Sequence, residues 1–253
     1  MAESGDSINM KLECYQLTSA GDREVNQDAM AHSITDDYGL FIVADGLGGH
    51  QAGEKASQFL CQGMLKWAAK YSPQIRQRPQ AVFSTWVDAA IGEMTRLFAA
   101  DSAASEAHTT CAILYVDAKV VLTAHCGDSR IYRMNPEEIL WRTKDHSVPQ
   151  QLLDKGEIQE HEIGSHPEQN RLTRSINVLK RYPAEINRYP PPVPGETFIL
   201  CSDGFWEHVK LSEFLELAQL SSGKAELVKK ARLSVLRAGG GSDNVTVQWV
   251  RCL

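Results

Sequence analysis

Short runs of apolar residues, or of alternating apolar and polar residues, recur along the chain. Alternation with a period of two is typical of a strand that buries one face, and a continuous apolar run of four to eight residues is typical of a strand buried on both faces. Nine such runs predict strands at residues 12–19, 28–34, 39–44, 110–117, 119–126, 130–134, 138–143, 196–202 and 244–251. We therefore expect β-sheets to dominate the fold.

Two pairs of predicted helices interrupt the strands. Residues 52–71 and 80–100 carry apolar side chains at helical spacing, and residues 211–220 and 224–237 form a second pair before the last strand. The aromatic residues of the first pair fit a core-facing stripe better than a cofactor site. Because strands and helices come in separate groups, the order predicts an α+β fold built on a β-sandwich.

Residues 144–195 differ from the rest of the chain. This segment is polar and rich in His and Pro, with a short helical pattern at residues 148–155 and a break at Tyr189-Pro190-Pro191-Pro192. Segments of this length without regular structure are usually functional loops. We expect a mobile flap inserted into one domain that spans residues 1–253.

Composition and charge narrow the class of protein. The 253 residues are 43% hydrophobic and 23% charged, which is ordinary for a globular protein, and the net charge of −6 disfavours a nucleic-acid partner. The six cysteines are scattered and form no C-x-x-C pair, which is typical of reduced thiols in the cytoplasm. Residues 1–9 do not resemble a signal peptide, and no apolar stretch is long enough to span a membrane.

Four aspartates stand at the boundaries of predicted strands. Asp45 and Asp203 each follow an apolar run and precede a glycine, Asp128 follows the run that ends at Cys126, and Asp243 precedes the last strand. Strand ends are rigid, and a neighbouring glycine leaves the backbone carbonyl open to an ion. If the four carboxylates converge, their hard oxygen atoms suit Mg²⁺ or Mn²⁺, and two such ions would clamp a phosphate and ionise a bridging water.

A plainer interpretation stays open for each of these sites. Asp-Gly and Gly-Asp-Ser sequences also form ordinary turns, and any one of them alone is better explained in that way. Arg23 lies between the first two predicted strands, where a guanidinium could hold a phosphoryl group but could equally be a solvated loop residue. Only the joint placement of the acidic residues favours a metal site.

Five motifs follow one another along the chain. They are Arg23-x-x-Asn26-Gln27-Asp28, Asp45-Gly46-Leu47-Gly48-Gly49-His50 with Gly53-Glu54-x-Ala56-Ser57, Gly127-Asp128-Ser129-Arg130, Ser202-Asp203-Gly204, and Ser242-Asp243-Asn244-Val245-Thr246. Together they resemble the type 2C, metal-dependent Ser/Thr protein phosphatases. The resemblance spans residues 18–250 and is to the compact stand-alone bacterial members. It implies two mainly antiparallel sheets in a sandwich flanked by helix pairs, in four layers α, β, β and α, and it identifies residues 144–195 as the flap.

The resemblance also implies a binuclear Mn²⁺ or Mg²⁺ centre between the sheets. Asp45 would bridge the two metals, the Gly46 carbonyl would bind one of them, and Asp203 and Asp243 would bind the other. Asp128, together with Asp203, would match a third and weaker metal position.

Two more residues receive roles from the resemblance, and one position departs from it. Asp28 would be a carboxylate beside the metal ligands, and Arg23 would clamp the phosphate. Leu47 stands where many eukaryotic members have a histidine thought to protonate the leaving alkoxide. This leaves a metal-bound water or a flap group such as His166 as candidate acids. A second departure, Ser175-Ile176-Asn177 where Ala-Leu-Gly is usual, means that the family's flap conformation should not be copied.

The predicted function is hydrolysis of phosphoserine and phosphothreonine on proteins by a metal-activated water, in opposition to a Ser/Thr kinase. The expected partners are phosphoproteins and a cognate kinase, with no nucleic acid and no membrane, and the expected state is a monomer. Two alternatives are a pseudophosphatase that binds phosphoproteins without turnover and a metal-dependent nucleotide or diester hydrolase. The retained acidic residues count against the first, and the acidic net charge counts against the second.

Overall fold

The computed structural model describes residues 10–48, 51–99, 107–178 and 183–253. Four parts of the sequence analysis lie outside these residues: the amino-terminal segment 1–9, the motif residues Gly49 and His50, the predicted helix end at Ala100, and residues 179–182 of the expected flap.

The first of two sheets has five strands. In spatial order they are β1 (Leu12–Ser19), β12 (Val245–Cys252), β11 (Thr197–Cys201), β7 (Arg130–Met134) and β8 (Ile139–Arg142). Every neighbouring pair is antiparallel. The first and last strands of the chain are therefore side by side.

The second sheet has seven strands. Its path runs through β10 (Glu185–Tyr189), β6 (Val121–Cys126), β5 (Cys111–Val116), β3 (Gly39–Leu47), β4 (His108–Thr109) and β9 (Ile176–Asn177), and β2 (Asp28–Ile34) pairs with β3. These pairings are antiparallel as well. The prediction of two antiparallel sheets is confirmed.

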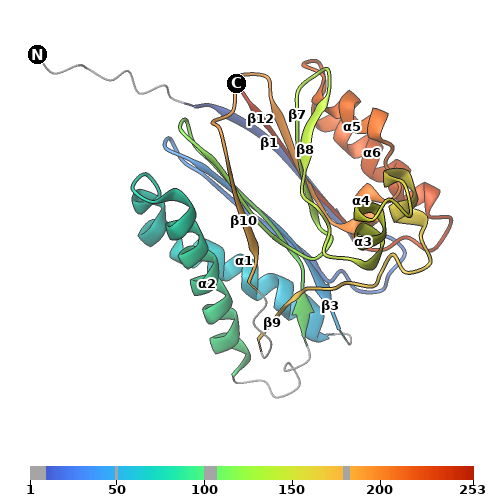
Figure 1. The fold of residues 1–253 in the computed structure, drawn as a ribbon, viewed down its shortest axis with the longest axis horizontal. Coiled ribbons are helices and arrows are strands. Elements are labelled where there is room, and N and C mark those ends of the chain that lie inside the picture. Colours follow the sequence, from blue (N-terminus) through green and yellow to red (C-terminus); the bar gives the residue numbers. More distant parts are fainter. Residues whose placement is uncertain (1–9, 49–50, 100–106, 179–182) are drawn as a thin grey trace, which may run out of the picture.

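The helices cover the outer faces of the two sheets (Figure 1). The longer elements are α1 (Gln51–Tyr71) and α2 (Pro79–Phe98) on the second sheet, and α5 (Leu211–Ala218) and α6 (Lys224–Arg237) on the first. Shorter elements are η1 (Ser72–Gln74), α3 (Val148–Asp154), η3 (Glu160–Ser165) and α4 (Asp203–Trp206). The order of layers is helices, sheet, sheet, helices, as predicted.

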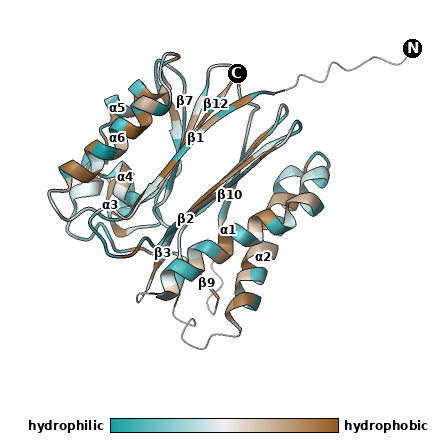
Figure 2. Ribbon diagram, turned by 180° about the vertical axis from the view of Figure 1, so that it is seen from behind, coloured by the Kyte–Doolittle hydropathy of each residue, from teal (hydrophilic) through white to brown (hydrophobic). Residues whose placement is uncertain are grey.

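Three apolar cores hold these layers together, one between the sheets and one under each helix layer. Between the sheets, Phe41, Val43, Leu114, Phe198 and Val250 are fully buried. Figure 2 shows that the hydrophobic colour is concentrated along the strands, whereas the helices alternate between hydrophobic and hydrophilic colour. This is the pattern expected when a helix turns one stripe toward a sheet.

Strand pairing shortens the flap expected at residues 144–195. Glu185–Tyr189 was not predicted as a strand, but it pairs with Val121–His125 of β6 and belongs to the second sheet. Within the rest of the segment lie α3, η3 and the two-residue strand β9. We therefore end the flap before residue 185. The strand β10 is only five residues long, does not alternate strictly between exposed and half-buried residues, and is followed by Pro190, so its sequence pattern is weak.

Among the described residues, no helix is long and apolar enough to cross a membrane.

Candidate functional site

Asp45 and Asp28 face one another across paired strands. The strand β3 continues to Leu47, three residues past its predicted end, so Asp45 lies within the strand, directly opposite Asp28 of β2. The backbone of Asp45 is fixed by Thr110, whose hydroxyl accepts the Asp45 N–H at 2.9 Å and whose N–H donates to the Asp45 carbonyl at 2.8 Å. Like charges directly opposite in a sheet are unfavourable. This pair therefore needs a compensating positive charge or a shared proton.

Asp203 is the first residue of α4, separated from the end of β11 by Ser202. Its Oδ1 accepts the N–H of Gly204 at 2.7 Å. A Cβ at Gly204 would lie 2.3 Å from the carbonyl oxygen of Asn244, so only glycine allows this close approach. The Asp203-Gly204 pair is thus packed against the loop that carries Asp243.

Asp128 enters the site from the loop between β6 and β7. Its carbonyl accepts the indole N–H of Trp206 at 2.9 Å, and Trp206 belongs to the same helix as Asp203. The neighbouring Ser129 shares a hydrogen bond of 2.6 Å with Thr110, the residue that fixes Asp45. These contacts tie three parts of the acidic cluster to one another.

Arg23 and Asp243 form an ion pair at the rim. Arg23 Nη2 lies 2.9 Å from Asp243 Oδ2, and the two side chains are 58% and 42% exposed. The loop that carries Arg23 is anchored by Asn244, whose Oδ1 accepts the Gln27 N–H at 2.7 Å and whose Nδ2 donates to the carbonyl of Val25. Arg23 is therefore placed beside the acidic cluster but remains accessible to a ligand.

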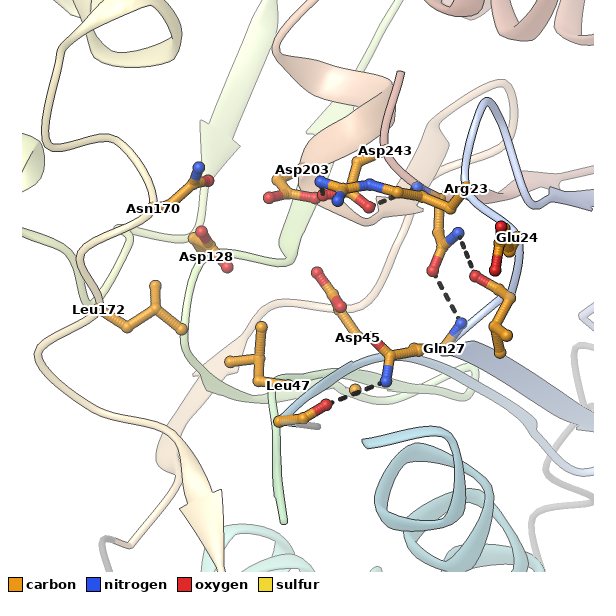
Figure 3. A pocket seen from close by; sticks show the side chains of 14 residues that line it. Arg23, Glu24, Gln27, Asp45, Leu47, Asp128, Asn170, Leu172, Asp203 and Asp243 are labelled. Atoms are coloured by element: carbon orange, nitrogen blue, oxygen red, sulfur yellow. Dashed lines mark hydrogen bonds and ion pairs between the residues drawn. The ribbon is translucent and has the colours of Figure 1, made fainter. Parts of the chain in front are cut away.

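One cavity of about 440 Å³ collects these residues. Of the predicted site residues, it is lined by Arg23, Asp45, Gly46, Asp128, Asp203 and Asp243. Figure 3 shows the side chains of Asp45, Asp128, Asp203 and Asp243 pointing toward a common centre. Asp28 does not line the cavity, but it is buried directly behind Asp45. The placement predicted from the sequence is thus what the structure contains, whereas the ligand roles stay predictions.

Gly46 is a glycine because α1 approaches it closely. A Cβ at this position would lie 2.1 Å from the carbonyl oxygen of Gly53 and 2.7 Å from that of Gln27. The Gly46 N–H donates to the same Gln27 carbonyl at 3.1 Å. Gly46 and Gly53 of the motif therefore allow β3 and α1 to come into close contact at the edge of the cavity.

Several lining residues were given no role by the sequence analysis. Gln27, Gly48 and Asn244 belong to the quoted motifs, whereas Glu24, Val25, Asn170 and Leu172 were not singled out. Nothing in the local sequence of Asn170 or Leu172 marks them as site residues. They reach the cavity only because the flap folds back over it.

Glu207 is a further acidic residue that the sequence analysis missed. It follows Asp203 by one helical turn, and its N–H donates to the Asp203 carbonyl at 3.0 Å. The side chain of Glu207 accepts a hydrogen bond from Gln169 of the flap. The i, i+4 spacing from Asp203 was a usable signal, because such residues share one face of a helix.

The electrostatics of the cluster favour protonated carboxyls when no cation is present. Burial raises the pKa of Asp45 well above the usual range, and the nearby charges of Asp28 and Asp203 add to the effect. Burial likewise raises the pKa of Asp203 well above the usual range, and the charge of Asp128 adds to it. Burial also raises the pKa of Asp28 to about 6 and that of Asp128 to about 7, with nearby carboxylates adding to the effect. The pKa of Glu207 rises to about 8 for the same reasons. Such shifts arise where like charges are gathered in a buried site.

The donor set fits divalent cations. It consists of carboxylate oxygens, the ligands that Mg²⁺ and Mn²⁺ prefer, and it carries more negative charge than Arg23 can balance. In addition, Asp28 Oδ1 is buried without a hydrogen-bond partner among the described residues. An unpaired buried carboxylate oxygen is costly unless a cation or a proton lies near it.

Two residues bear on the question of the proton donor, Leu47 at the departing position and the candidate acid His166. Leu47 is a wall of the cavity, as expected for the position that departs from the eukaryotic pattern. His166 is not among the described lining residues, and its Nδ1 accepts the N–H of Glu168 at 3.1 Å. The geometry does not favour His166 as a proton donor.

Comparison with known proteins agrees with this site. The profile of the family described as Protein phosphatase 2C matches residues 18–233. The serine/threonine phosphatase stp of Listeria innocua is 31% identical over 215 residues, which cover 82% of this chain and 82% of that protein.

Solved structures of the same fold are also similar. The Mycobacterium tuberculosis serine/threonine phosphatase PstP/Ppp superposes with a TM-score of 0.80 at 26% identity, covering 95% of this chain and 98% of that one. The Stp1 phosphatase of Staphylococcus aureus superposes with a TM-score of 0.81 at 25% identity, covering 99% of both chains. The acidic cavity, the four-layer fold and these matches together place the chain in the protein phosphatase 2C family of metal-dependent serine/threonine phosphatases.

Proposed function

We infer that this protein hydrolyses phosphoserine and phosphothreonine in other proteins, with two divalent cations, Mn²⁺ or Mg²⁺, held by the acidic cavity. The single observation that carries this inference is the convergence of Asp45, Asp128, Asp203 and Asp243 in one cavity with Arg23 at its rim. A phosphate dianion is recognised by cations and by a guanidinium, and this cavity offers a place for both.

We assign the metal-binding roles as follows. Asp45 lies at the centre of the cluster and would bridge the two ions, with the Gly46 carbonyl on one side and Asp203 and Asp243 on the other. Asp128 with Asp203 would hold a third, weaker ion. When bound, the cations would lower the pKa of water toward neutrality and offset the negative charge of the phosphoryl oxygens.

The protein's own groups hold and orient the reactants. Arg23 can turn from Asp243 to a phosphoryl oxygen because both side chains are substantially exposed. Asp28 supports Asp45 from behind, and its position is fixed by the Ser202 hydroxyl, which donates to Asp28 Oδ2 at 2.7 Å. Asn170 and Leu172 of the flap face the rim and would contact the polypeptide that carries the phosphate.

A metal-removal experiment tests the proposed function. The protein is treated with EDTA, and release of phosphate from a phosphothreonine peptide is measured before and after addition of Mn²⁺ or Mg²⁺. We expect activity to disappear with EDTA and to return with either cation, to extents that identify the preferred metal. Ca²⁺ serves as a control because it binds oxygen ligands with looser geometry.

The same assay separates the alternatives. Binding of the phosphopeptide without turnover in the presence of metal would indicate a pseudophosphatase. Faster hydrolysis of a phosphodiester than of the phosphopeptide would indicate a diester hydrolase.

We further propose that the chain is a single catalytic domain, acts as a monomer in the cytoplasm and opposes a cognate Ser/Thr kinase. Sedimentation and assays on kinase-phosphorylated proteins test the oligomeric state and the partner.

A further inference from the structure

The proposed reaction needs a proton donor that the cavity wall does not supply. Cleavage of a phosphoserine or phosphothreonine ester leaves the bonding electron pair on an alkoxide oxygen, a poor leaving group unless it is protonated. Among the described residues that line the cavity, none is His, Lys, Tyr or Cys. Of the lining carboxyl groups, Asp45, Asp128, Asp203 and Asp243 are the proposed cation ligands, which must be deprotonated to bind. The remaining one, Glu24, is exposed to solvent. A donor is therefore expected just beyond the wall.

His108 lies directly next to this wall. It belongs to β4, where it is paired with Leu47 in antiparallel register. Residues directly opposite in antiparallel strands project to the same face, with Cβ atoms about 4.5–5.5 Å apart. The Leu47 side chain points into the cavity (Figure 3), so the imidazole of His108 stands on the same face of the sheet beside it.

The flap holds the imidazole in place. His108 Nδ1 lies 2.8 Å from Ser175 Oγ, three residues after the cavity-lining Leu172. The backbone of His108 is also paired with Asn177 of β9, so β4 lies between the cavity floor and the end of the flap. His108 is half-buried, so the residue is partly shielded from bulk water.

The strand that carries His108 is connected to the proposed metal site. The hydroxyl of the adjacent residue, Thr109, donates to the Asp45 carbonyl at 3.0 Å, and Thr109 is paired with Gly46. Because β4 is fixed in this way, His108 is held at a defined position relative to the cavity, as proton transfer requires.

We propose that His108 donates the proton to the leaving serine or threonine oxygen. This proposal rests on the proposed function. One P–O bond forms to the oxygen of water and the ester P–O bond breaks, leaving its electron pair on the side-chain oxygen. The imidazolium of His108 gives that oxygen a proton, and the proton released by the attacking water restores the imidazolium. One water is consumed, and the products are a free hydroxyl group and phosphate.

A comparison of two leaving groups tests this role. The variant His108→Gln keeps a polar side chain near Ser175 but cannot act as an acid. With saturating Mn²⁺, we expect kcat on a phosphothreonine peptide to fall about 100-fold, the lower end for loss of general acid catalysis. The leaving group of p-nitrophenyl phosphate needs no proton, so kcat on this substrate should fall less than about threefold.

Further variants separate chemistry from structure. His166→Gln removes a flap histidine that does not line the cavity, and both activities should stay unchanged. Ser175→Ala keeps the imidazole but removes its hydroxyl neighbour, so it should lower peptide turnover by about tenfold or less and spare p-nitrophenyl phosphate. Calorimetric Mn²⁺ affinity and the melting temperature of His108→Gln should equal those of the wild type.

Each outcome has one meaning. Equal losses on both substrates, or a change in Mn²⁺ affinity, would assign His108 a structural role and overturn the proposal. Unchanged peptide turnover in His108→Gln would also overturn it while leaving the proposed phosphatase function intact. A wild-type protein that is inactive on both substrates with metal present would overturn the proposed function itself, and the role of His108 with it.

Discussion

The same strands build two regions of opposite character, an apolar interior and an acidic end. In β3, Leu40 to Ala44 are completely buried and apolar, and the next residue is Asp45. In β11, Phe198 to Cys201 are likewise buried, and Asp203 follows one residue after the strand. Burying apolar surface stabilises the folded state by roughly 25 cal/mol for each Å² removed from water. Gathering carboxylates in a buried site raises the free energy of the folded state.

This contrast shows how the fold can hold a site that opposes its own folding. The inter-sheet core fixes the strands, and the strands carry the acidic residues into one cavity in spite of their repulsion. Substitutions in the interior should therefore lower stability and spare chemistry. Substitutions at the acidic end should abolish chemistry and spare, or even raise, the stability of the metal-free protein.

The largest effect is expected at the centre of the acidic cluster. Asp45→Asn should lower metal-dependent turnover on the order of 1,000-fold or more, because the cations supply several kcal/mol of the transition-state stabilisation. In EDTA, the melting temperature of this variant should equal or exceed that of the wild type, since it lacks the buried carboxyl whose raised pKa lowers the stability of the metal-free protein near neutral pH. Steady-state kinetics and thermal unfolding measure the two effects.

Asp203→Asn should behave in the same way, and Asp88→Asn on the exposed face of α2 is a matched control with no expected effect. Near-wild-type turnover of Asp45→Asn with metal present would contradict the binuclear site.

The interior should give the opposite result. Leu114→Ala removes a fully buried side chain between the sheets and should lower the free energy of unfolding by about 3 kcal/mol. Turnover per folded molecule should be unchanged well below the melting temperature. Denaturant unfolding measures the free energy of unfolding. Leu236→Ala is the control: its position is 74% exposed, so the free energy of unfolding should change by less than about 0.5 kcal/mol.

Arg23→Ala tests the rim of the cavity. Loss of one charge-assisted hydrogen bond to phosphate should cost about 2 kcal/mol, or roughly 30-fold in kcat/KM. Metal affinity measured by calorimetry should be retained, because Arg23 is no ligand. Arg76→Ala removes a similarly exposed arginine that pairs with Asp37 and serves as the control. If metal affinity were lost and phosphate affinity kept, Arg23 would instead position Asp243.

A smaller effect concerns pH and the metal-free protein. The raised pKa values of Asp28, Asp128 and Glu207, about 6, 7 and 8, mean that the folded state holds protons that the unfolded state releases near pH 4. Stability therefore falls as the pH rises through this window, from about pH 4 to about pH 8. We expect the melting temperature in EDTA to drop by roughly 5 °C across it.

Two comparisons check the origin of this drop. Saturating Mn²⁺ should reduce it, because bound cations favour the deprotonated carboxylates, and Asp128→Asn should reduce it without metal. An equal drop in Asp128→Asn and in the wild type, both measured in EDTA, would show that another group is responsible.

Much of the fold was predictable from local patterns. The runs that became β1, β2 and β7 are rich in apolar residues because these strands pack against apolar cores on both faces. The two long helix pairs have a helical period because one face of each helix packs on a sheet. The acidic residues were predictable as well, since each stands beside a glycine or a strand boundary. Local sequence determines such positions because turn and strand geometry depend on a few neighbouring residues.

Other features depended on long-range packing. β10 forms only because its edge pairs with β6, and β4 and β9 are two residues each, so neither has a period to detect. Asn170 and Leu172 reach the cavity through the folding of the flap, and Glu207 is placed one turn after Asp203 by α4.

The residue types needed for metal-assisted phosphate chemistry can be read from the chain alone, because carboxylates, glycines and an arginine in this order limit the possible chemistry. Which of these side chains are neighbours depends on the folded structure. Asp28 faces Asp45, Arg23 pairs with Asp243, and His108 faces Leu47. These partners lie 17, 220 and 61 positions apart in the sequence. Their proximity comes from strand register and loop closure, which the hydrophobic core of the whole sandwich fixes.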